Sequence, residues 1–314
     1  MFGLDVVSLV AELLDLVQQV DDDLLAQGVD VRNRPLRAGS PISVKLKIPI
    51  MLGADRDPIS AVIKHYYDLV YGKDHLAIGP LHVGALMIRD MFEEVYVPHI
   101  SGSVKIDAWD HVQRMDRPRL DLLSTLFPHE LKVCADQIAD VFDFAFAVED
   151  QSMSEPRAQE LLWLCKEQIE AACRTLLGSF SKRVAVQGSC YAVELIGKAA
   201  LVQSGKTDED LRSLGHNLAK IYNELPDALP GPDYGRINWC LKQLPNVIDE
   251  RYSFDGLDRR RIGHTVRCSQ YVLGEIGRWI SDRDIRGERN GAVERVFPPD
   301  QRSVRTTKKA KNSR

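Results

Sequence analysis

The stretch SCYAVELIGKAALVQSGKTDEDLRSLGHNLAKIYNELP, residues 189–226, predicts two helices joined by a short polar turn. Gly205 follows the first helix, at the position where a left-handed backbone costs little. Asp208 to Asp210 begin the second helix, where the helix dipole favours acids. Pro226 is expected to end it. The stretch therefore predicts an antiparallel helical hairpin, whose first helix has one small apolar face at three- and four-residue steps: Ala192, Leu195, Ile196, Ala199 and Ala200.

Three segments in and after this stretch resemble, in their order, the HEPN family. They are Tyr191 to Ala199, Gly215 to Leu218, and Glu250 to Tyr252 ahead of a final helix. The family pattern has Asp where this chain has Asn217 and Pro where it has Ser253. HEPN domains are helical bundles that commonly self-associate. The resemblance therefore implies an all-α HEPN-like bundle over residues 155–285 and a homodimer formed through it.

The candidate binding residues within these segments are Glu194, Lys198, His216, Arg251 and Tyr252. Each also has a structural interpretation. Glu194 and Lys198 are four residues apart and would form an ion pair on a helix surface. His216 would hold the hairpin by a hydrogen bond. Arg251 and Tyr252 would anchor the loop before the last helix.

The composition is that of an ordinary globular protein, with 44% hydrophobic and 27% charged residues among 314, which is enough for two domains. Six cysteines occur without a CxxC pair or a signal peptide. They predict reduced, buried thiols in a cytoplasmic protein. The longest apolar run is shorter than the ~18 residues that a membrane span needs, so no membrane insertion is expected.

The charge is distributed unevenly along the chain. The last thirteen residues contain six basic side chains and no acidic one, so a whole-chain charge of −4 leaves −10 for the rest. We expect residues 286–314 to form a basic disordered tail. An acidic body favours a basic protein partner over bare nucleic acid, whose phosphates it would repel.

The first 150 residues predict an α+β domain. Helices are expected over residues 3–26, 58–71 and 81–94, and the acidic run at Asp21 to Asp23 is interpreted as solvated surface. Alternating or continuous apolar runs predict strands. These runs are Ile42 to Leu52, Val95 to Ile100, Ser103 to Ala108 and Val141 to Val148. The predicted order is thus an α+β domain over residues 1–150, the bundle over 155–285 and the tail.

A mixed domain followed by a HEPN bundle is similar to the arrangement of nucleotidyltransferase–HEPN proteins. This resemblance implies a nucleotidyltransferase-like first domain, whose Mg²⁺ would be held by Asp-x-Asp on one strand. Asp107 and Asp110 are three residues apart, which would direct the two carboxylates to opposite faces of a strand. Asp55 and Asp57 have the required spacing but precede Pro58 in a turn. The sequence therefore predicts a degenerate site without catalytic residues, metal or cofactor.

Many HEPN proteins cleave RNA with an Arg-x4-6-His motif on a bundle helix. Arg259 and His264 have that spacing, but Gly and Asp residues around them predict a loop before the last helix, which we expect over residues 265–281. The neighbouring Arg260 and Arg261 are interpreted as part of the same basic loop.

The two-domain order, the acidic body and the basic tail are also similar to the relaxase-recruiting proteins of agrobacterial T-DNA transfer. The function we expect is a non-enzymatic dimeric adaptor that binds a protein or nucleoprotein partner, such as a relaxase–DNA complex bound for type IV secretion. Ala192, Ala199 and Ala200 would let two bundles approach closely. The alternatives are a nucleotidyltransferase–HEPN enzyme, acting by nucleotide transfer or RNA cleavage, and a nucleotide sensor with a pocket near Lys198, His216 and Arg251.

Overall fold

The computed structural model describes residues 3–50, 57–77, 79–100, 107–178, 182–245, 257–281 and 283–290. These residues are mostly helical with one two-stranded sheet, so the predicted combination of a helical bundle and a small α+β part is confirmed. Backbone contacts divide the chain into two compact units, Met1–Gly79 (unit 1) and Pro80–Arg314 (unit 2). No helix of the described ranges is long and apolar enough to cross a membrane.

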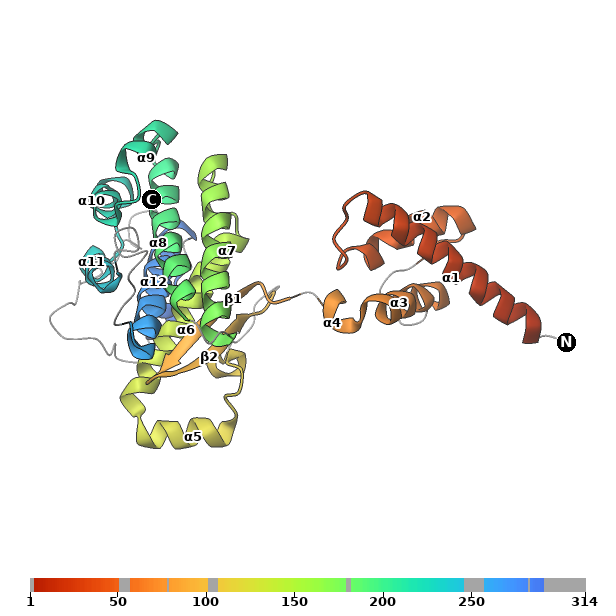
Figure 1. The fold of residues 1–314 in the computed structure, drawn as a ribbon, viewed down its shortest axis with the longest axis horizontal. Coiled ribbons are helices and arrows are strands. Elements are labelled where there is room, and N and C mark those ends of the chain that lie inside the picture. The colour runs from red at the N-terminus through yellow and green to blue at the C-terminus, as the bar shows by residue number, and fades with distance from the viewer. Residues whose placement is uncertain are drawn as a thin grey trace, which may run out of the picture. The chain divides into compact units, whose positions relative to one another are not determined.

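Unit 1 consists of helices in its described part (Figure 1). These are α1 (Gly3–Ala26), α2 (Arg34–Leu46), α3 (Pro58–Tyr71) and the short α4 (Lys73–Leu76). The predicted helices over residues 3–26 and 58–71 are confirmed, and the carboxylate of Asp57 caps α3 by accepting the backbone N–H groups of Ile59 and Ser60. The strand predicted from Ile42 is wrong, because α2 continues to Leu46 and ends where Lys47 adopts a left-handed backbone conformation.

Asp21 is buried and not solvated as the sequence suggested. The Tyr71 hydroxyl donates a hydrogen bond to its carboxylate, and Arg34 Nη1 lies 3.5 Å from it. Arg34 in turn donates from Nε to the carbonyl of Val29 at 2.8 Å. A buried carboxylate needs such partners, and a run of three acids does not reveal which of them has one.

Unit 2 is built on four long helices that lie side by side in Figure 1. They are α6 (Pro128–Glu149), α7 (Pro156–Gly178), α8 (Arg183–Gln203) and α12 (Arg259–Ser281). The shorter elements are η1 (Ala108–His111), α5 (Arg117–Leu126), α9 (Asp208–Leu214), α10 (Leu218–Ala228), α11 (Tyr234–Gln243) and α13 (Ile285–Asn290). Helix α7 lies within the range predicted for the helical bundle, residues 155–285, and all six cysteines are buried as expected.

The sequence suggested a domain boundary near residue 150, but the chain divides at Gly79. Helix α6 explains this difference. Val141 to Val148 is helical, not a strand, and its side chains are buried without exception. A helix that is buried on every side has a continuous apolar sequence, which periodicity cannot distinguish from a buried strand. Because α6 packs against α12, the segment before residue 150 belongs to the same core as the bundle.

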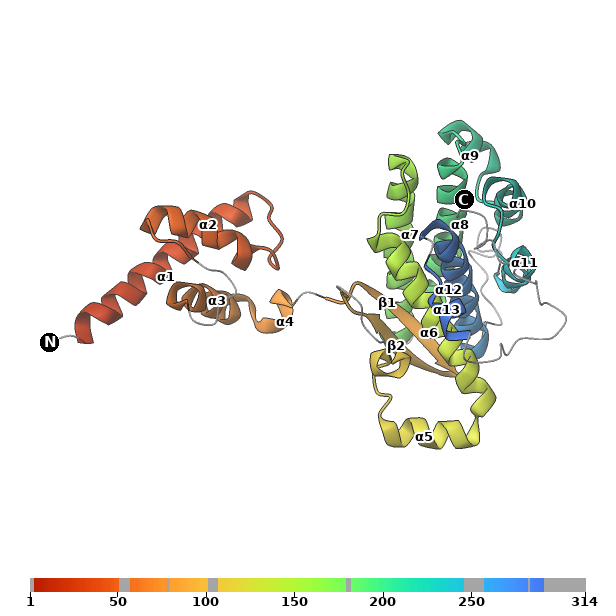
Figure 2. The same cartoon turned by 180° about the vertical axis from the view of Figure 1, so that it is seen from behind.

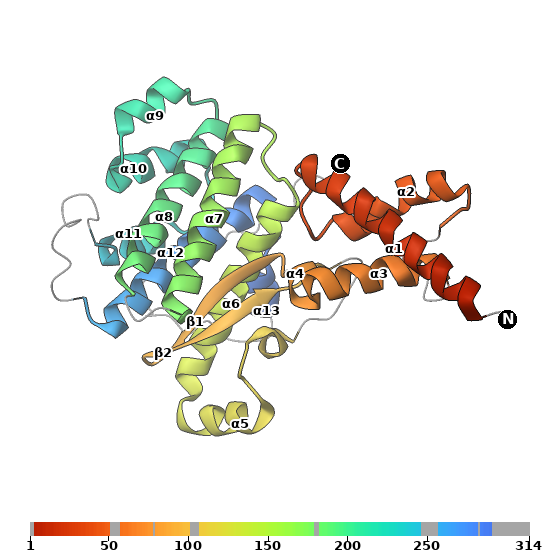
Figure 3. The same ribbon diagram turned by 45° about the vertical axis from the view of Figure 1, so that its right-hand side comes forward.

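The sheet is an antiparallel hairpin of β1 (His82–Ile88) and β2 (Met91–Val97), which lies across α6 in Figure 3. A helix was predicted over residues 81–94, and this prediction is wrong. Every residue of β1 is buried, so the strand lacks the alternation of polar and apolar residues that would have identified it. Val95 belongs to β2, whereas most of the strand predicted over Ser103 to Ala108 lies outside the described residues.

Side-chain amides satisfy the backbone of β1 on the edge that does not pair with β2. Gln270 of α12 accepts the N–H of Ala85 at 2.8 Å and donates to its carbonyl at 2.7 Å. Gln137 of α6 does the same for Met87, at 3.2 and 3.3 Å. These four hydrogen bonds replace those of a third strand. They attach the hairpin to two helices of the bundle, since buried backbone groups must be paired.

The hairpin predicted over residues 189–226 is confirmed in its first half and divided in its second. Helix α8 ends at Gln203 and Gly205 has a φ of +99°. The second helix is interrupted at Gly215, with a φ of +61°, and becomes α9 and α10. Pro226 does not end α10, which continues to Ala228.

Candidate functional site

Three of the five predicted binding residues come together. The Glu194 carboxylate, 8% exposed, accepts Lys198 Nζ at 2.7 Å and lies 2.9 Å from His216 Nδ1. The interruption at Gly215 places His216 in the short link between α9 and α10, directly before Asn217, which caps α10. From this link the imidazole reaches Glu194 on α8. The predicted pairing of Glu194 with Lys198 is confirmed, and His216 bonds across the hairpin. Arg251 and Tyr252 lie outside the described residues.

The small residues expected to face a second copy are inside the monomer. Ala192 and Ala199 are completely buried and Ala200 is 3% exposed, all in the main core of unit 2. A dimer therefore cannot form on these residues. We expect Ala199→Arg to disrupt folding and not only association.

The aspartates considered for a metal do not form a site where the structure describes them, and Asp55 lies outside the described residues. Asp107 caps η1, accepting the backbone N–H of Trp109, and pairs with Arg117 at 3.1 Å. Asp110 lies in η1 and not on a strand, and Asp57 caps α3 in unit 1. Among the described residues, no group of three or more His, Cys, Asp or Glu side chains is arranged to hold a metal ion.

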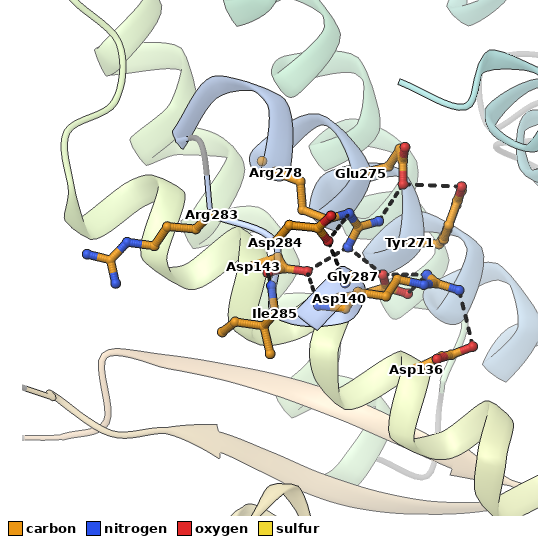
Figure 4. Close-up of polar contacts among 12 residues, drawn as sticks. Asp136, Asp140, Asp143, Tyr271, Glu275, Arg278, Arg283, Asp284, Ile285 and Gly287 are labelled. Carbon is orange, nitrogen blue, oxygen red and sulfur yellow. Dashed lines mark hydrogen bonds and ion pairs between the residues drawn. The ribbon is translucent and has the colours of Figure 1, made fainter. Parts of the chain in front are cut away.

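A buried ionic network lies between α6, α12 and α13 (Figure 4). Arg278, 1% exposed, donates to Asp140 at 2.9 Å, to Asp143 at 2.7 Å and to Glu275 at 2.5 Å. Arg286 donates to Asp140 at 2.6 Å and to Asp136 at 3.3 Å. The three aspartates follow steps of four and three residues on α6. That spacing was in the sequence, but the strand predicted over Asp143 concealed it.

The network holds α13 against α6. Figure 2 shows where α13, α6 and α12 lie in the bundle. The backbone N–H of Ile285 donates to Asp143 Oδ1 at 2.8 Å. Burial raises the pKa of Asp143 to about 6, and the charge of Arg278 opposes this shift. Because Arg286 is buried and paired, the body of unit 2 extends beyond the predicted start of the tail at residue 286. Residues 291–314 lie outside the described part.

An arginine-lined pocket of about 690 Å³ lies at the start of α12. Three segments that are distant in sequence form it: the β1–β2 turn, the start of α6 and the first turns of α12. Arg259 and His264 were expected in a loop, but α12 begins at Arg259 because Asp258 accepts the backbone N–H of Arg261 at 2.7 Å. The lining residues are Met87, Arg89, Asp90, His129, Glu130, Val133, Asp258, Arg259, Arg260, His264 and Arg267.

Two of the pocket's arginines are fixed by contacts with its wall. Arg259 donates from Nε to the carbonyl of Asp90 at 2.5 Å, and its guanidinium lies 4.6 Å from the ring centre of Phe92. The guanidinium of Arg89 lies 4.6 Å from the ring centre of Phe127. Aromatic faces attract cations, so these contacts position both guanidiniums.

Burial and two neighbouring arginines disfavour the protonated form of His264. Desolvation, followed by the charges of Arg267 and Arg260, lowers the pKa of His264 from 6.5 to about 4. The side chain is half-buried on α12, one turn from Arg260 and one from Arg267. The imidazole is therefore neutral at pH 7 and can donate or accept a hydrogen bond.

This pKa predicts how the stability of unit 2 depends on pH. Unfolded His264 binds a proton below pH 6.5, whereas folded His264 does so only below about 4. In that window the unfolded chain binds more protons, so the free energy of unfolding falls as the pH falls. We expect His264→Gln to reduce this slope. His82 and His111, whose pKa values burial also lowers, would retain part of it.

Urea unfolding at several pH values between 7 and about 4, followed by tryptophan fluorescence, measures the slope. The fluorescence reports unit 2 alone, because all four tryptophans belong to it. Equal slopes for His264→Gln and the wild type would contradict the prediction. The four tryptophans are Trp109, Trp163, Trp239 and Trp279.

Comparisons with protein-family models, curated proteins and solved structures found no match to this chain. The function proposed below therefore depends on the geometry of the described residues and on the resemblance of the sequence segments.

Proposed function

We propose that the chain is a non-catalytic adaptor, in which unit 2 is a HEPN-like bundle that pairs with a second copy and holds a protein or nucleoprotein partner. The four-helix core of unit 2 supports this proposal, as does the position of two resembling segments on α8 and at the start of α10. Glu194, Lys198 and His216 then stabilise the hairpin of the bundle by their mutual contacts.

The observation on which the proposal rests is a set of exposed apolar side chains on the paired helices α7 and α8. Leu164, Val184 and Tyr191 are 42%, 59% and 43% exposed, although both helices already bury their opposite sides in the core. Leu164 and Tyr191 lie at one level, because their neighbours are joined by a hydrogen bond from Cys165 Sγ to the carbonyl of Ala192. Exposed apolar side chains on two neighbouring helices favour an interface, and a symmetric pair would use these side chains twice.

The partner we propose is basic, since the chain without its last thirteen residues has a charge of −10. A relaxase carrying DNA, delivered to a type IV secretion system in T-DNA transfer, has that chemistry and agrees with the resemblance of the sequence. The adaptor would act in the cytoplasm. Charge complementarity would steer such a partner to the acidic body.

The double variant Leu164→Asp/Tyr191→Asp is expected to convert the proposed dimer into a monomer. On association, the introduced carboxylates of both copies would have to lose their hydration water. Like charges would also face each other across the symmetry axis. Sedimentation equilibrium of the full chain at tens of micromolar measures the oligomeric state.

Leu122→Asp/Leu126→Asp is the matched control, because these α5 side chains are 58% and 56% exposed in the same unit and lie away from α7 and α8. We expect the control to remain dimeric. A wild-type chain that sediments as a monomer, or a control that dissociates equally, would contradict the proposed interface.

A second candidate function is RNA cleavage, and one observation favours it: Arg259 and His264 both lie on bundle helix α12 and line the same pocket. In many HEPN nucleases such a pair is on a helix. Cleavage of single-stranded RNA by the purified chain, lost in His264→Ala, would contradict the non-catalytic proposal and favour this one.

A further inference from the structure

The arginine-lined pocket has cationic groups that the fold does not use. Within the described residues, Arg260 and Arg267 form no hydrogen bond or ion pair. They are seven residues apart on α12, which is two helical turns, so both lie on the face that borders the pocket. His264 lies between them on the same face.

The carboxylates of the pocket are fewer than its arginines. Among the described residues, Asp90, Glu130 and Asp258 line it together with four arginines, an excess of one positive charge without counting the two histidines. Asp258 already accepts the N–H of Arg261, and Glu130 lies 4.0 Å from Arg89. Neither carboxylate forms an ion pair with Arg260 or Arg267, and the two guanidiniums remain available to a ligand.

We infer that this pocket binds a ligand through its phosphate groups, which Arg260 and Arg267 hold while Met87 and Val133 contact its organic part. A guanidinium presents two parallel N–H groups that match two phosphate oxygens, which an ammonium does not. The neutral imidazole of His264 can donate a further hydrogen bond. A volume of about 690 Å³ is that of a small-molecule site and accommodates a nucleotide.

This inference goes beyond the adaptor function and does not depend on it, because the described residues that line the pocket all belong to one copy of unit 2. The shared chemistry is the phosphate oxyanion, which two sources could supply: a free nucleotide or the backbone of a single-stranded nucleic acid. A free nucleotide would lie entirely inside the pocket, whereas a single-stranded nucleic acid would continue beyond it.

Isothermal titration of the full chain with pyrophosphate, ADP and a short single-stranded oligonucleotide tests the inference. We expect saturable binding, and a loss of about a hundredfold in Arg260→Gln/Arg267→Gln, since a hydrogen bond to a charged group contributes about tenfold in affinity at each arginine. Tighter binding of ADP than of the oligonucleotide would identify a nucleotide site, and the reverse order a polynucleotide site.

Arg174→Gln/Arg212→Gln is the matched control, with the same loss of charge at two exposed arginines outside the pocket. The six basic residues among the last thirteen are present in every variant, so binding by them would not respond to the pocket substitutions. Arg260→Lys/Arg267→Lys preserves the charge and should lose about tenfold in affinity if the paired N–H groups matter. Absence of binding by the wild type, or equal losses in pocket variant and control, would overturn the inference.

Discussion

Arg278→Met is expected to lower the free energy of unfolding of unit 2 by about 3–5 kcal/mol. The guanidinium of Arg278 is buried and donates to Asp140, Asp143 and Glu275. Methionine would fill much of the same volume but would remove the guanidinium that these three carboxylates share, and Asp140 would keep only Arg286 of its two arginines. An uncompensated buried charge costs several kcal/mol, because water cannot reach it.

Arg283→Met is the matched control for this experiment. Arg283 also pairs with an aspartate, Asp150, at 2.6 Å, but its side chain is 48% exposed. An exposed ion pair contributes about 0–1 kcal/mol, so we expect a correspondingly small change. Urea unfolding followed by tryptophan fluorescence gives both values. Equal effects of the two substitutions would show that the buried network does not stabilise α13 and the bundle.

Gly274→Ala is expected to destabilise unit 2 by about 2 kcal/mol, because it would force α6 and α12 apart. A Cβ atom at Gly274 would lie 2.6 Å from the backbone oxygen of Asp140 and 2.8 Å from its Cα. Backbone atoms cannot move aside as the end of a flexible side chain can. Since Asp140 also binds Arg278 and Arg286, any displacement would lengthen the ion pairs of the network. The better helix propensity of alanine, up to about 1 kcal/mol, offsets only part of this cost.

Gly235→Ala provides the control, since Gly235 is an exposed residue of α11. A Cβ atom there would lie 3.5 Å from Asp233 Oδ1, an ordinary contact. We expect unchanged or slightly higher stability from the propensity gain alone. The same unfolding measurement compares the two alanines. A Gly274→Ala variant as stable as the wild type would mean that the two helices can separate without loss.

The local chemistry of the sequence predicted several elements correctly. Asp57 before Pro58 indicated the start of α3, and the structure places both as expected. Gly205 after an apolar helix indicated the end of α8. The four-residue step from Glu194 to Lys198 indicated their ion pair. Each of these features depends on residues within about one helical turn, so propensity and capping determine it.

Two of the segments that were predicted incorrectly are buried on all sides. The strand β1 was expected as a helix and the middle of α6 as a strand, because neither has a polar face from which a period could be measured. The face of α8 that carries small residues was predicted correctly as one side of a helix, but the surface that packs against it was not. Ala192 and Ala199 pack within the same chain, and the sequence does not state which surface covers them.

By itself, the sequence determined where α1 and α3 begin and end, where α8 ends, that the thiols are buried, and that Glu194 and Lys198 pair. Only the tertiary structure decided which distant residues meet: Arg89 and His129 with Arg267 around the pocket, and Asp140 with Arg278 and Arg286 in the network. The physical reason is that capping and periodicity act over a few residues, whereas these contacts join residues more than a hundred positions apart. Such contacts form only when the packing of α6 against α12 and the β1–β2 hairpin has fixed the distances between them.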